Sequence, residues 1–394
     1  MPSPTAIKCL VVATATANAS IDTMCFDIAT AMRRLGIGVR IMLHGETPQG
    51  GELLSLLLGE LDSYPGPSFV MDTNGKLSVT AGERSFFDVY DIPKFSFITD
   101  NPVHQLAHID SAPDNWLCGL VSTEYMEHLD LFGLSSRPAV LFPHGGPPPL
   151  ASVLTSAERD IDVLFAGNIK AVEPFEEWLR ITFPASPRIE RALLAAKDDL
   201  ASPGAHPFTV TVEALRDGGI DVTRDILAEA YVPLDRYLIN RERGRVLGAI
   251  RRHTVTVIGD VDGGVIPNDS PHRILGAKTF SEVLHAMSLA KVTLNVVPTF
   301  RSGGHERIFY GLSAGSMVLT DRNEFLAPDI KAESGIRFLP DDLADLDDVL
   351  SQWTGDSATL DALRPAALQH YSARHSWDQR IKPVLDKLNL EYFA

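Results

Sequence analysis

Short apolar runs alternate with longer stretches of helical spacing along most of the chain. Lys8–Ala13 is an almost continuous apolar run, as expected for a strand covered on both faces of a parallel sheet. Asp22–Leu35 then repeats apolar residues at helical spacing, Gly36 ends that pattern, and Val39–Leu43 is a second apolar run. This β–α–β order predicts a doubly wound α/β domain at the start of the chain.

The rest of the first half continues the same alternation. Leu53–Leu61 has helical spacing, and the runs that follow it indicate strands at Ser68–Thr80, Phe95–Thr99, Leu117–Ser122 and Ala139–Phe142. The dipeptide Asn74-Gly75 lies inside the first of these runs and predicts a hairpin turn there.

A proline- and glycine-rich segment separates the two halves of the chain. Pro143–Pro149 reads PHGGPPP, which is typical of a linker. We therefore expect a first domain over residues 1–147 and a second over residues 155–375. The strands expected in the second half are Ile161–Ala166, Val255–Gly259, Val292–Val297, Met317–Thr320 and Ile336–Leu339. Residues 172–254 are mostly helical in pattern and too long for one crossover, so we expect a helical insertion.

Composition limits the function classes. The chain has 394 residues and a formal net charge of −16, which fits two globular domains and does not favour nucleic acid as a partner. Its three cysteines (Cys9, Cys25, Cys118) share no metal-like spacing, and their odd number argues against a disulfide framework and for a reducing, cytoplasmic compartment. No window predicts a transmembrane segment. A homo-oligomer stays possible.

Candidate chemistry is concentrated in Phe300–Asp321, FRSGGHERIFYGLSAGSMVLTD. Ser302, Gly303 and Gly304 stand where a helix is expected to begin, with His305, Glu306 and Arg307 in its first turn. Free N–H groups at a helix start attract anions, and an arginine adds a charge-assisted donor suited to phosphate. Gly315 is expected to end the helix in a left-handed conformation. A Gly-Gly pair before a helix is also a common structural turn, and that interpretation stays open.

Several segments in order resemble a known family. They are Asp160–Asn168 (DIDVLFAGN), Val255–Gly259 (VTVIG), Thr293–Val297 (TLNVV) and Gly303–Asp321. With them, the chain resembles the GT-B glycosyltransferases, and its second half resembles the "glycosyl transferases group 1" domain of CgeB-like proteins. The resemblance implies two Rossmann-like α/β domains facing a cleft, with a C-terminal helix over 376–394 that packs back on the first domain.

The resemblance also implies a binding site for a nucleotide-sugar donor, UDP type as the first guess, on the second domain. The donor-binding residues would be Gly167, Asn168, Lys170, Gly259, Ser302, Gly303, Gly304, His305, Glu306 and Arg307. The better-known retaining enzymes of this fold carry two glutamates, whose positions fall near Ser302 and Tyr310 here. Their roles therefore cannot be transferred, and the stereochemical outcome stays open.

An inverting transferase needs a base beside the acceptor hydroxyl, and the first domain would supply it. Asp100 is the first candidate because it ends a predicted buried strand, and Asp22 and His104 follow. Helix capping is the structural alternative for Asp22, and an Asp-Asn-Pro turn is the alternative for Asp100. We expect no metal site, because the glycine-rich donor loop before the expected helix has no Asp-x-Asp motif or cluster of metal ligands, and His104 and His108 lack a third ligand.

Three function classes remain open from the sequence. The first is a metal-independent sugar transferase acting on a glycan, protein or small-molecule acceptor. The second is a nucleotide-sugar epimerase or hydrolase. The third is a binding module on the same fold without catalysis, since a fold alone does not define a function.

Overall fold

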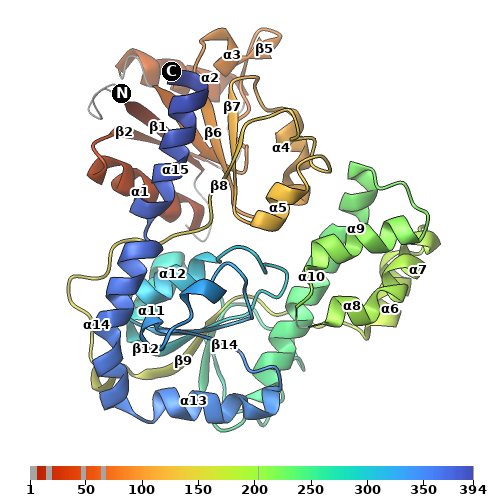
Figure 1. Ribbon diagram of the computed structural model, residues 1–394, viewed down its shortest axis with the longest axis vertical. Coiled ribbons are helices and arrows are strands. Elements are labelled where there is room, and N and C mark those ends of the chain that lie inside the picture. Colours follow the sequence, from red (N-terminus) through yellow and green to blue (C-terminus); the bar gives the residue numbers. More distant parts are fainter. Residues whose placement is uncertain (1–6, 15–19, 46–49, 64–67, 203, 394) are drawn as a thin grey trace. The chain divides into compact units, whose positions relative to one another are not determined.

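The structure is a computed structural model that describes residues 7–14, 20–45, 50–63, 68–202 and 204–393. The chain divides into two compact units (Figure 1). The first unit comprises the part up to Pro147 together with the segment that begins at His375, and the second spans Pro148–Arg374.

The first unit contains a six-stranded sheet in the order β2-β1-β3-β6-β7-β8. Every neighbouring pair is parallel. The strands are β1 (Lys8–Thr14), β2 (Gly38–His44), β3 (Phe69–Thr73), β6 (Lys94–Ile98), β7 (Trp116–Leu120) and β8 (Ala139–Leu141). The helices include α1 (Ser20–Arg34), α2 (Gly50–Ser63), α4 (Leu106–Asp110), α5 (Thr123–Glu127) and α15 (Trp377–Leu388). The predicted doubly wound class is confirmed.

The predicted hairpin at Asn74-Gly75 is wrong. The two residues form a turn with φ of 58° and 68°, but β3 pairs with β1 and β6 and not with the residues after the turn. The antiparallel pair of this region lies further on, between β4 (Thr80–Ala81) and β5 (Arg84–Ser85). The turn instead fixes a neighbouring strand end, because the Asn74 side chain accepts a hydrogen bond of 2.8 Å from the Thr99 N–H.

The C-terminal segment is built into the first unit. Trp377 is fully buried, and its ring lies 5.9 Å from that of Phe97, centroid to centroid. The Trp377 backbone N–H donates to the Gly146 carbonyl at 3.0 Å, while the Arg380 side chain donates to the His144 carbonyl at 3.0 Å. The PHGG segment and the start of α15 therefore run side by side.

The second unit contains another parallel six-stranded sheet, in the order β11-β10-β9-β12-β13-β14. Its strands are β9 (Ile161–Ala166), β10 (Val255–Ile258), β11 (Arg273–Ile274), β12 (Ala290–Asn295), β13 (Met317–Thr320) and β14 (Ile336–Phe338). Counted from β9, this is the strand order of a classic dinucleotide-binding domain, and the order reverses between β9 and β12.

Among the described residues, five helices lie between β9 and β10. They are α6 (Phe175–Thr182), α7 (Pro187–Ala195), α8 (Lys197–Ala201), α9 (Pro207–Asp217) and the long α10 (Arg224–Ala249). Figure 1 shows α6 to α9 as a group to one side of the second sheet, connected to it by α10. The other helices of this unit are α11 (Phe280–Leu289), α12 (Glu306–Ser313), α13 (Leu346–Thr354) and α14 (Ser357–Arg374). No helix of the described ranges is long and apolar enough to span a bilayer.

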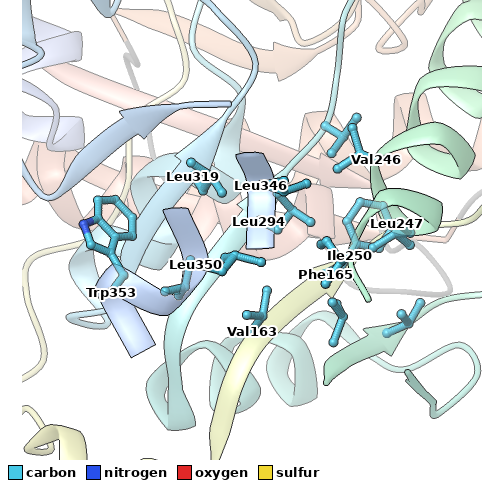
Figure 2. Close-up of a cluster of buried hydrophobic side chains, with 14 of the residues drawn as sticks. Val163, Phe165, Val246, Leu247, Ile250, Leu294, Leu319, Leu346, Leu350 and Trp353 are labelled. Carbon is cyan, nitrogen blue, oxygen red and sulfur yellow. The ribbon is translucent and has the colours of Figure 1, made fainter. Parts of the chain in front are cut away.

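A buried apolar cluster fixes α10 and α13 on the second sheet. Val246 and Leu247 of α10 and its C-cap residue Ile250 are fully buried against side chains of β9 and β12, and Leu346 and Leu350 of α13 pack on the same cluster (Figure 2). Burial of such side chains contributes roughly 1.5–3 kcal/mol each. The end of α10 is thus held firmly, which sets the position of the polar residues one turn earlier.

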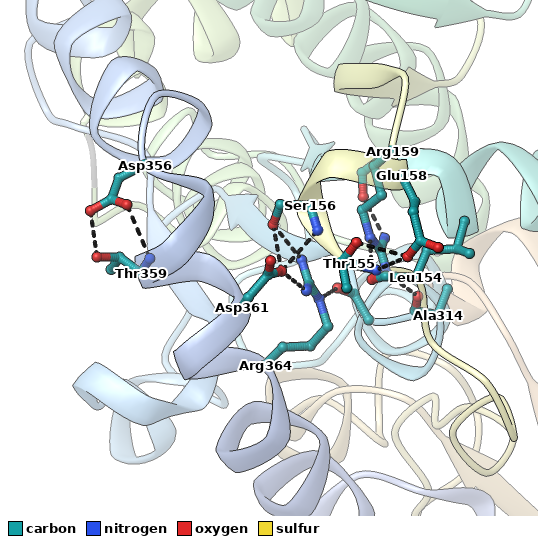
Figure 3. A network of polar contacts seen from close by, with 12 residues as sticks. Leu154, Thr155, Ser156, Glu158, Arg159, Ala314, Asp356, Thr359, Asp361 and Arg364 are labelled. Atoms are coloured by element: carbon teal, nitrogen blue, oxygen red, sulfur yellow. Dashed lines mark hydrogen bonds and ion pairs between the residues drawn. The ribbon is translucent and has the colours of Figure 1, made fainter.

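A polar network fixes the far end of α12 (Figure 3). Arg159 donates to the Ala290 and Ala314 carbonyls at 2.6 and 2.9 Å, and Arg364 donates to the Gly315 carbonyl at 2.9 Å. Gly315 has a φ of +75°, as predicted for the residue that ends this helix, and a Cβ there would lie 2.3 Å from the Val153 side chain.

Candidate functional site

The predicted donor-binding residues lie at the carboxyl ends of the second sheet's strands. Gly167 and Asn168 follow β9, Gly259 follows β10, and residues 302–305 lie between β12 and α12, whose first two residues are Glu306 and Arg307. In a parallel sheet these ends share one edge, and ligands bind where the strand order reverses. Here the order reverses between β9 and β12.

The ends of β9 and β10 are pinned closely together. A Cβ on Gly259 would lie 2.3 Å from the Gly167 carbonyl oxygen, and Gly259 has a φ of +145°. Both the close approach and the backbone conformation therefore disfavour a side chain at this position. Asn168 accepts a hydrogen bond of 2.9 Å from the Asp260 N–H. The close approach of the two strand ends therefore requires glycine at this point.

The helix α12 begins one residue later than predicted. His305 is its N-cap, with extended backbone, and Glu306 is the first helical residue. The His305 Nδ1 atom lies 2.8 Å from Glu306 Oε2 and 3.4 Å from the Arg307 N–H. One ring nitrogen cannot donate to the first and accept from the second at once, and the shorter contact favours a proton on Nδ1.

Arg307 turns back toward the sheet. Its guanidinium lies 3.4 Å from Asn295 Oδ1 at the end of β12 and 3.3 Å from His305 Nε2, and only 13% of its side chain is exposed. Burial lowers the pKa of this guanidinium, while the carboxylates of Glu306 and Asp321 oppose that shift. The cation is held at the start of α12, where the helix dipole also favours an anion.

The glycine-rich loop before α12 is fixed by Asn323. The Asn323 side chain donates to the Phe300 carbonyl at 2.8 Å and to the Gly303 carbonyl at 2.5 Å. A Cβ on Gly304 would lie 2.3 Å from the Phe309 ring. Ser302 is buried. The loop is therefore preorganised by packing, and the glycine is required by close approach.

Arg243 of α10 is a site residue that the sequence did not predict. Its guanidinium donates to the Asn168 carbonyl at 2.8 Å and to the Val296 carbonyl at 3.2 Å, so it bridges the ends of β9 and β12. Burial, with the nearby positive charge of Arg307, lowers its pKa to about 9. The sequence did not single it out, because Arg243 is one of several arginines on the amphipathic stretch Asp235–Arg252, which is compatible with a basic rim over the site and with a solvated helix face.

Asp321 is the acidic counterpart at the end of β13. It is 8% exposed and accepts a hydrogen bond of 2.5 Å from the Val297 N–H. Burial raises the pKa of Asp321 to about 6, against the opposing effect of that hydrogen bond and of Arg301 and Arg243. By contrast, Lys170 is exposed, and its Nζ pairs with Asp262 at 3.2 Å.

The three base candidates all belong to the first unit. Asp100 is exposed, two residues after the end of β6, and accepts a hydrogen bond of 3.3 Å from the Thr99 hydroxyl. Asn101 performs the capping role in this turn, with its Oδ1 accepting from the Val103 N–H at 3.0 Å. Asp22 lies in the first turn of α1, and His104 lies in the short 3-10 helix that follows Asp100. Their catalytic roles stay predictions.

The two positions that correspond to the retaining enzymes' glutamates lie inside the protein. Tyr310 is 1% exposed and Ser302 is 3% exposed, and the Tyr310 ring packs edge-on against Phe280 at 5.3 Å. Neither side chain therefore presents a nucleophile to a substrate in this structure.

Comparisons with known proteins agree with this architecture. Residues 241–386 match the family model described as glycosyl transferase-like. No curated protein matches the chain in sequence. An alpha-glucosyltransferase in complex with UDP is similar in structure, with a TM-score of 0.54 and 10% identity over 97% of this chain and 99% of that one.

Two further solved structures are similar. HepE of Anabaena, in complex with UDP and glucose, has a TM-score of 0.51 and 10% identity over 98% of this chain and 100% of that one. AviGT4, a glycosyltransferase involved in avilamycin A biosynthesis, has a TM-score of 0.53 and 12% identity over 98% of both chains. At identities this low, the structural similarity establishes the fold alone.

The family match and the fold together define the class of protein: it is a glycosyltransferase with the GT-B architecture. The matched residues include the end of α10 with Arg243, the α12 start and Asp321. The resemblance predicted from the sequence is confirmed at this level, and the finer likeness to CgeB-like proteins stays a prediction.

Proposed function

We propose that the protein transfers a sugar from a uridine diphosphate sugar to an acceptor hydroxyl, without a metal ion. One observation carries the proposal: Arg243 and Arg307 approach the ends of β9 and β12 from two different helices. This is the point where a doubly wound sheet binds its ligand. The alpha-glucosyltransferase and HepE structures contain UDP, which supports uridine as the first base to test.

The leaving diphosphate would develop negative charge at the start of α12. The two guanidiniums and the N–H groups at the start of that helix would stabilise this charge without reorganising. Glu306 is proposed to accept a hydrogen bond from a ribose or sugar hydroxyl. Asp100 is proposed as the base that accepts the proton of the acceptor hydroxyl, with Asp22 and His104 as the alternatives.

Binding and turnover separate this proposal from the other two function classes. Calorimetric titration with UDP, GDP and dTDP should show tightest binding for UDP. A transferase should release the nucleoside diphosphate slowly from its sugar donor until an acceptor is supplied. Release at full rate in water alone would identify a hydrolase, and binding without any release would identify a binding module.

Metal dependence is tested with the same assay. If guanidiniums provide the charge stabilisation, turnover should be nearly unchanged by EDTA. Activity that disappears with EDTA and returns only with Mn²⁺ or Mg²⁺ would contradict the metal-independent mechanism.

We also place the enzyme in the cytoplasm. Support comes from Cys9, Cys25 and Cys118, which are all free and buried, as is usual for cysteines in a reducing compartment.

A further inference from the structure

A second charged pocket lies beside the donor residues, within the second unit. Its volume is about 90 Å³, and it is bounded by α10, the segment between α8 and α9, and the residues after β12, β13 and β14. Four arginines line it: Arg241, Arg245, Arg301 and Arg322. A water molecule needs only about 10–15 Å³ of such volume, so the pocket has room for a group of several atoms.

The carboxylates of the pocket do not neutralise all four arginines. Arg245 pairs with Glu242 at 2.6 Å, and Arg322 lies 3.4 Å from Asp341. Among the described residues, Arg241 and Arg301 have no carboxylate within ion-pair distance. Only the buried Asp321 remains to oppose these two positive charges.

The two uncompensated arginines come from different directions. Arg241 stands on α10, with its guanidinium 5.8 Å from the centroid of the Tyr237 ring. Arg301 stands on the loop after β12 and donates one hydrogen bond, from Nη1 to the Arg322 carbonyl at 2.9 Å. Its Nε atom is buried and has no hydrogen-bond partner among the described residues. A buried donor without a partner is costly, and an anion in the pocket would satisfy it.

We propose that this pocket binds a phosphate group, separately from the diphosphate of the donor. Guanidiniums recognise phosphate oxygens through paired charge-assisted hydrogen bonds. Two guanidiniums converging from separate elements suit a tetrahedral dianion, which offers oxygens in several directions. The phosphate is either inorganic phosphate or a monoester carried by a sugar.

Asp321 makes this binding sensitive to pH. Its carboxyl faces Arg301 from the loop and Glu242 and Arg243 from α10, and Arg245, Arg322 and Asp341 line the same pocket. Because burial raises the pKa of Asp321 to about 6, the carboxyl loses its charge as pH falls through that value. Removing a negative charge from the pocket strengthens anion binding, so the affinity should rise toward acid pH.

The first test is calorimetric titration of the full chain with inorganic phosphate. Arg241→Gln and Arg301→Gln should each weaken phosphate binding by roughly 10- to 100-fold, as expected for the loss of hydrogen bonds to a charged group. Arg307→Gln should leave phosphate binding intact and weaken UDP binding instead. Arg216→Gln, an exposed arginine on α9, is the matched control and should change neither.

Several results would overturn the proposal. No heat of binding at roughly 10 mM phosphate, a concentration well above a 1 mM Kd, would do so. Phosphate binding that is lost in Arg307→Gln and kept in Arg241→Gln and Arg301→Gln would assign the phosphate to the donor site. The melting temperature of each variant shows whether it folds. If Arg301→Gln does not fold, the phosphate affinity of Arg241→Gln alone decides the test. A wild-type chain that binds phosphate but not UDP would disprove the proposed donor and leave this pocket standing.

A second titration distinguishes the source of the phosphate. Glucose 6-phosphate should compete with inorganic phosphate if the pocket accepts a sugar monoester, and should not compete if it accepts only the free ion. Either outcome supports a phosphate pocket, provided that Arg241→Gln abolishes the competition or the binding.

The charge of Asp321 is tested with sulfate, whose own charge is constant over this range. Sulfate should bind more tightly at pH 5 than at pH 8, and Asp321→Asn should bind it about tenfold more tightly than wild type at pH 8. The variant keeps an oxygen for the Val297 N–H and should lose the pH dependence. Equal sulfate affinities for variant and wild type at pH 8 would contradict a pocket that includes Asp321.

Discussion

Buried charged side chains are arranged differently in the two sheets. In the first, Asp72 of β3 and Lys94 of β6 form an ion pair of 3.2 Å, with side chains 3% and 1% exposed. Asp72 also accepts from the Leu77 N–H at 2.7 Å and from the Ser96 hydroxyl. Lys94 donates to the Leu77 carbonyl at 2.7 Å. In the second sheet, charge gathers at the strand ends, where Arg243, Arg307 and Asp321 lie.

The difference lies in how the charges are arranged. In the first pair one cation faces one anion, which we call saturated, and in the second group two guanidiniums lie close together, which we call unsaturated. Protein groups supply the hydrogen-bond partners of Asp72 and Lys94. These contacts with Leu77 and Ser96 fix the turn at Asn74 and do not require a ligand. The second group has two arginines in close proximity, with the pKa of each lowered by burial. Neighbouring like charges that the protein holds together mark a place where an anion is expected. A saturated network predicts stability, and an unsaturated one predicts binding.

The largest expected effect concerns the first unit's strand ends. If Asp100 is the base, Asp100→Asn should lower turnover by roughly 10²–10⁴-fold, because the shape is kept and the proton acceptor is removed. Donor affinity should barely change, since the donor residues belong to the other unit. Turnover, UDP affinity and melting temperature are measured together, with Asp22→Asn and His104→Ala in parallel. Near-normal turnover in Asp100→Asn would show that another group is the catalytic base.

Breaking the saturated pair should cost stability without changing donor binding. Lys94→Met leaves the Asp72 carboxylate buried and unpaired, which should lower the free energy of unfolding by about 3–5 kcal/mol. Lys197→Met removes an exposed pair of 2.8 Å with Glu176 and should change stability far less, because exposed ion pairs contribute little. Denaturant unfolding measures both. Equal small losses would mean that burial of the first pair adds nothing.

The unsaturated group should show the reverse behaviour. Arg307→Ala should weaken UDP binding by about 1.5–3 kcal/mol, the range for a hydrogen bond to a charged group, and Arg243→Ala should act similarly. The two guanidiniums would hold one diphosphate. The loss of UDP-binding free energy in the double variant should therefore differ from the sum of the two single losses. Calorimetry on all three variants tests this, and unchanged affinity would exclude Arg307 from the site.

The smallest expected effect is a pH-dependent change in stability at Asp321. Its pKa is about 6 when folded and near the ordinary value of 3.8 when unfolded. The folded state therefore binds the proton more tightly, and the contribution of this group to stability falls as pH rises from about 4 to 6. Asp321→Asn should accordingly raise the melting temperature more at pH 8 than at pH 4.5. The opposite order would show that Arg301 and Arg243 outweigh the cost of burial.

The strands were predictable where the sheet is buried on both faces. Ile161–Ala166 and Met317–Thr320 match β9 and β13 residue for residue, because a covered parallel strand must be a continuous apolar run. The same rule missed Lys94, a charged first residue of β6 that is buried only because Asp72 pairs with it. It also missed β11, whose two residues are both exposed and carry no apolar pattern.

The site was predictable in its local part alone. The turn from β12 into α12 is contiguous in sequence, so its glycines and Arg307 could be recognised together. Arg243 lies far along the chain from Asn168, and only the position of α10 on the core brings them into contact. Asp321 is next to a predicted strand, but its altered pKa depends on burial that no local pattern reveals.

The return of the chain to the first unit affects the order in which the protein forms during synthesis. Trp377 fills a space against Phe97 and Phe142, and Asp378 pairs with Arg34 of α1 at 2.6 Å. The first unit therefore stays incomplete on the ribosome until after the whole second unit has been translated. The domain that begins first is finished last, and a nascent chain stopped before His375 would carry an open aromatic cavity for chaperones to recognise.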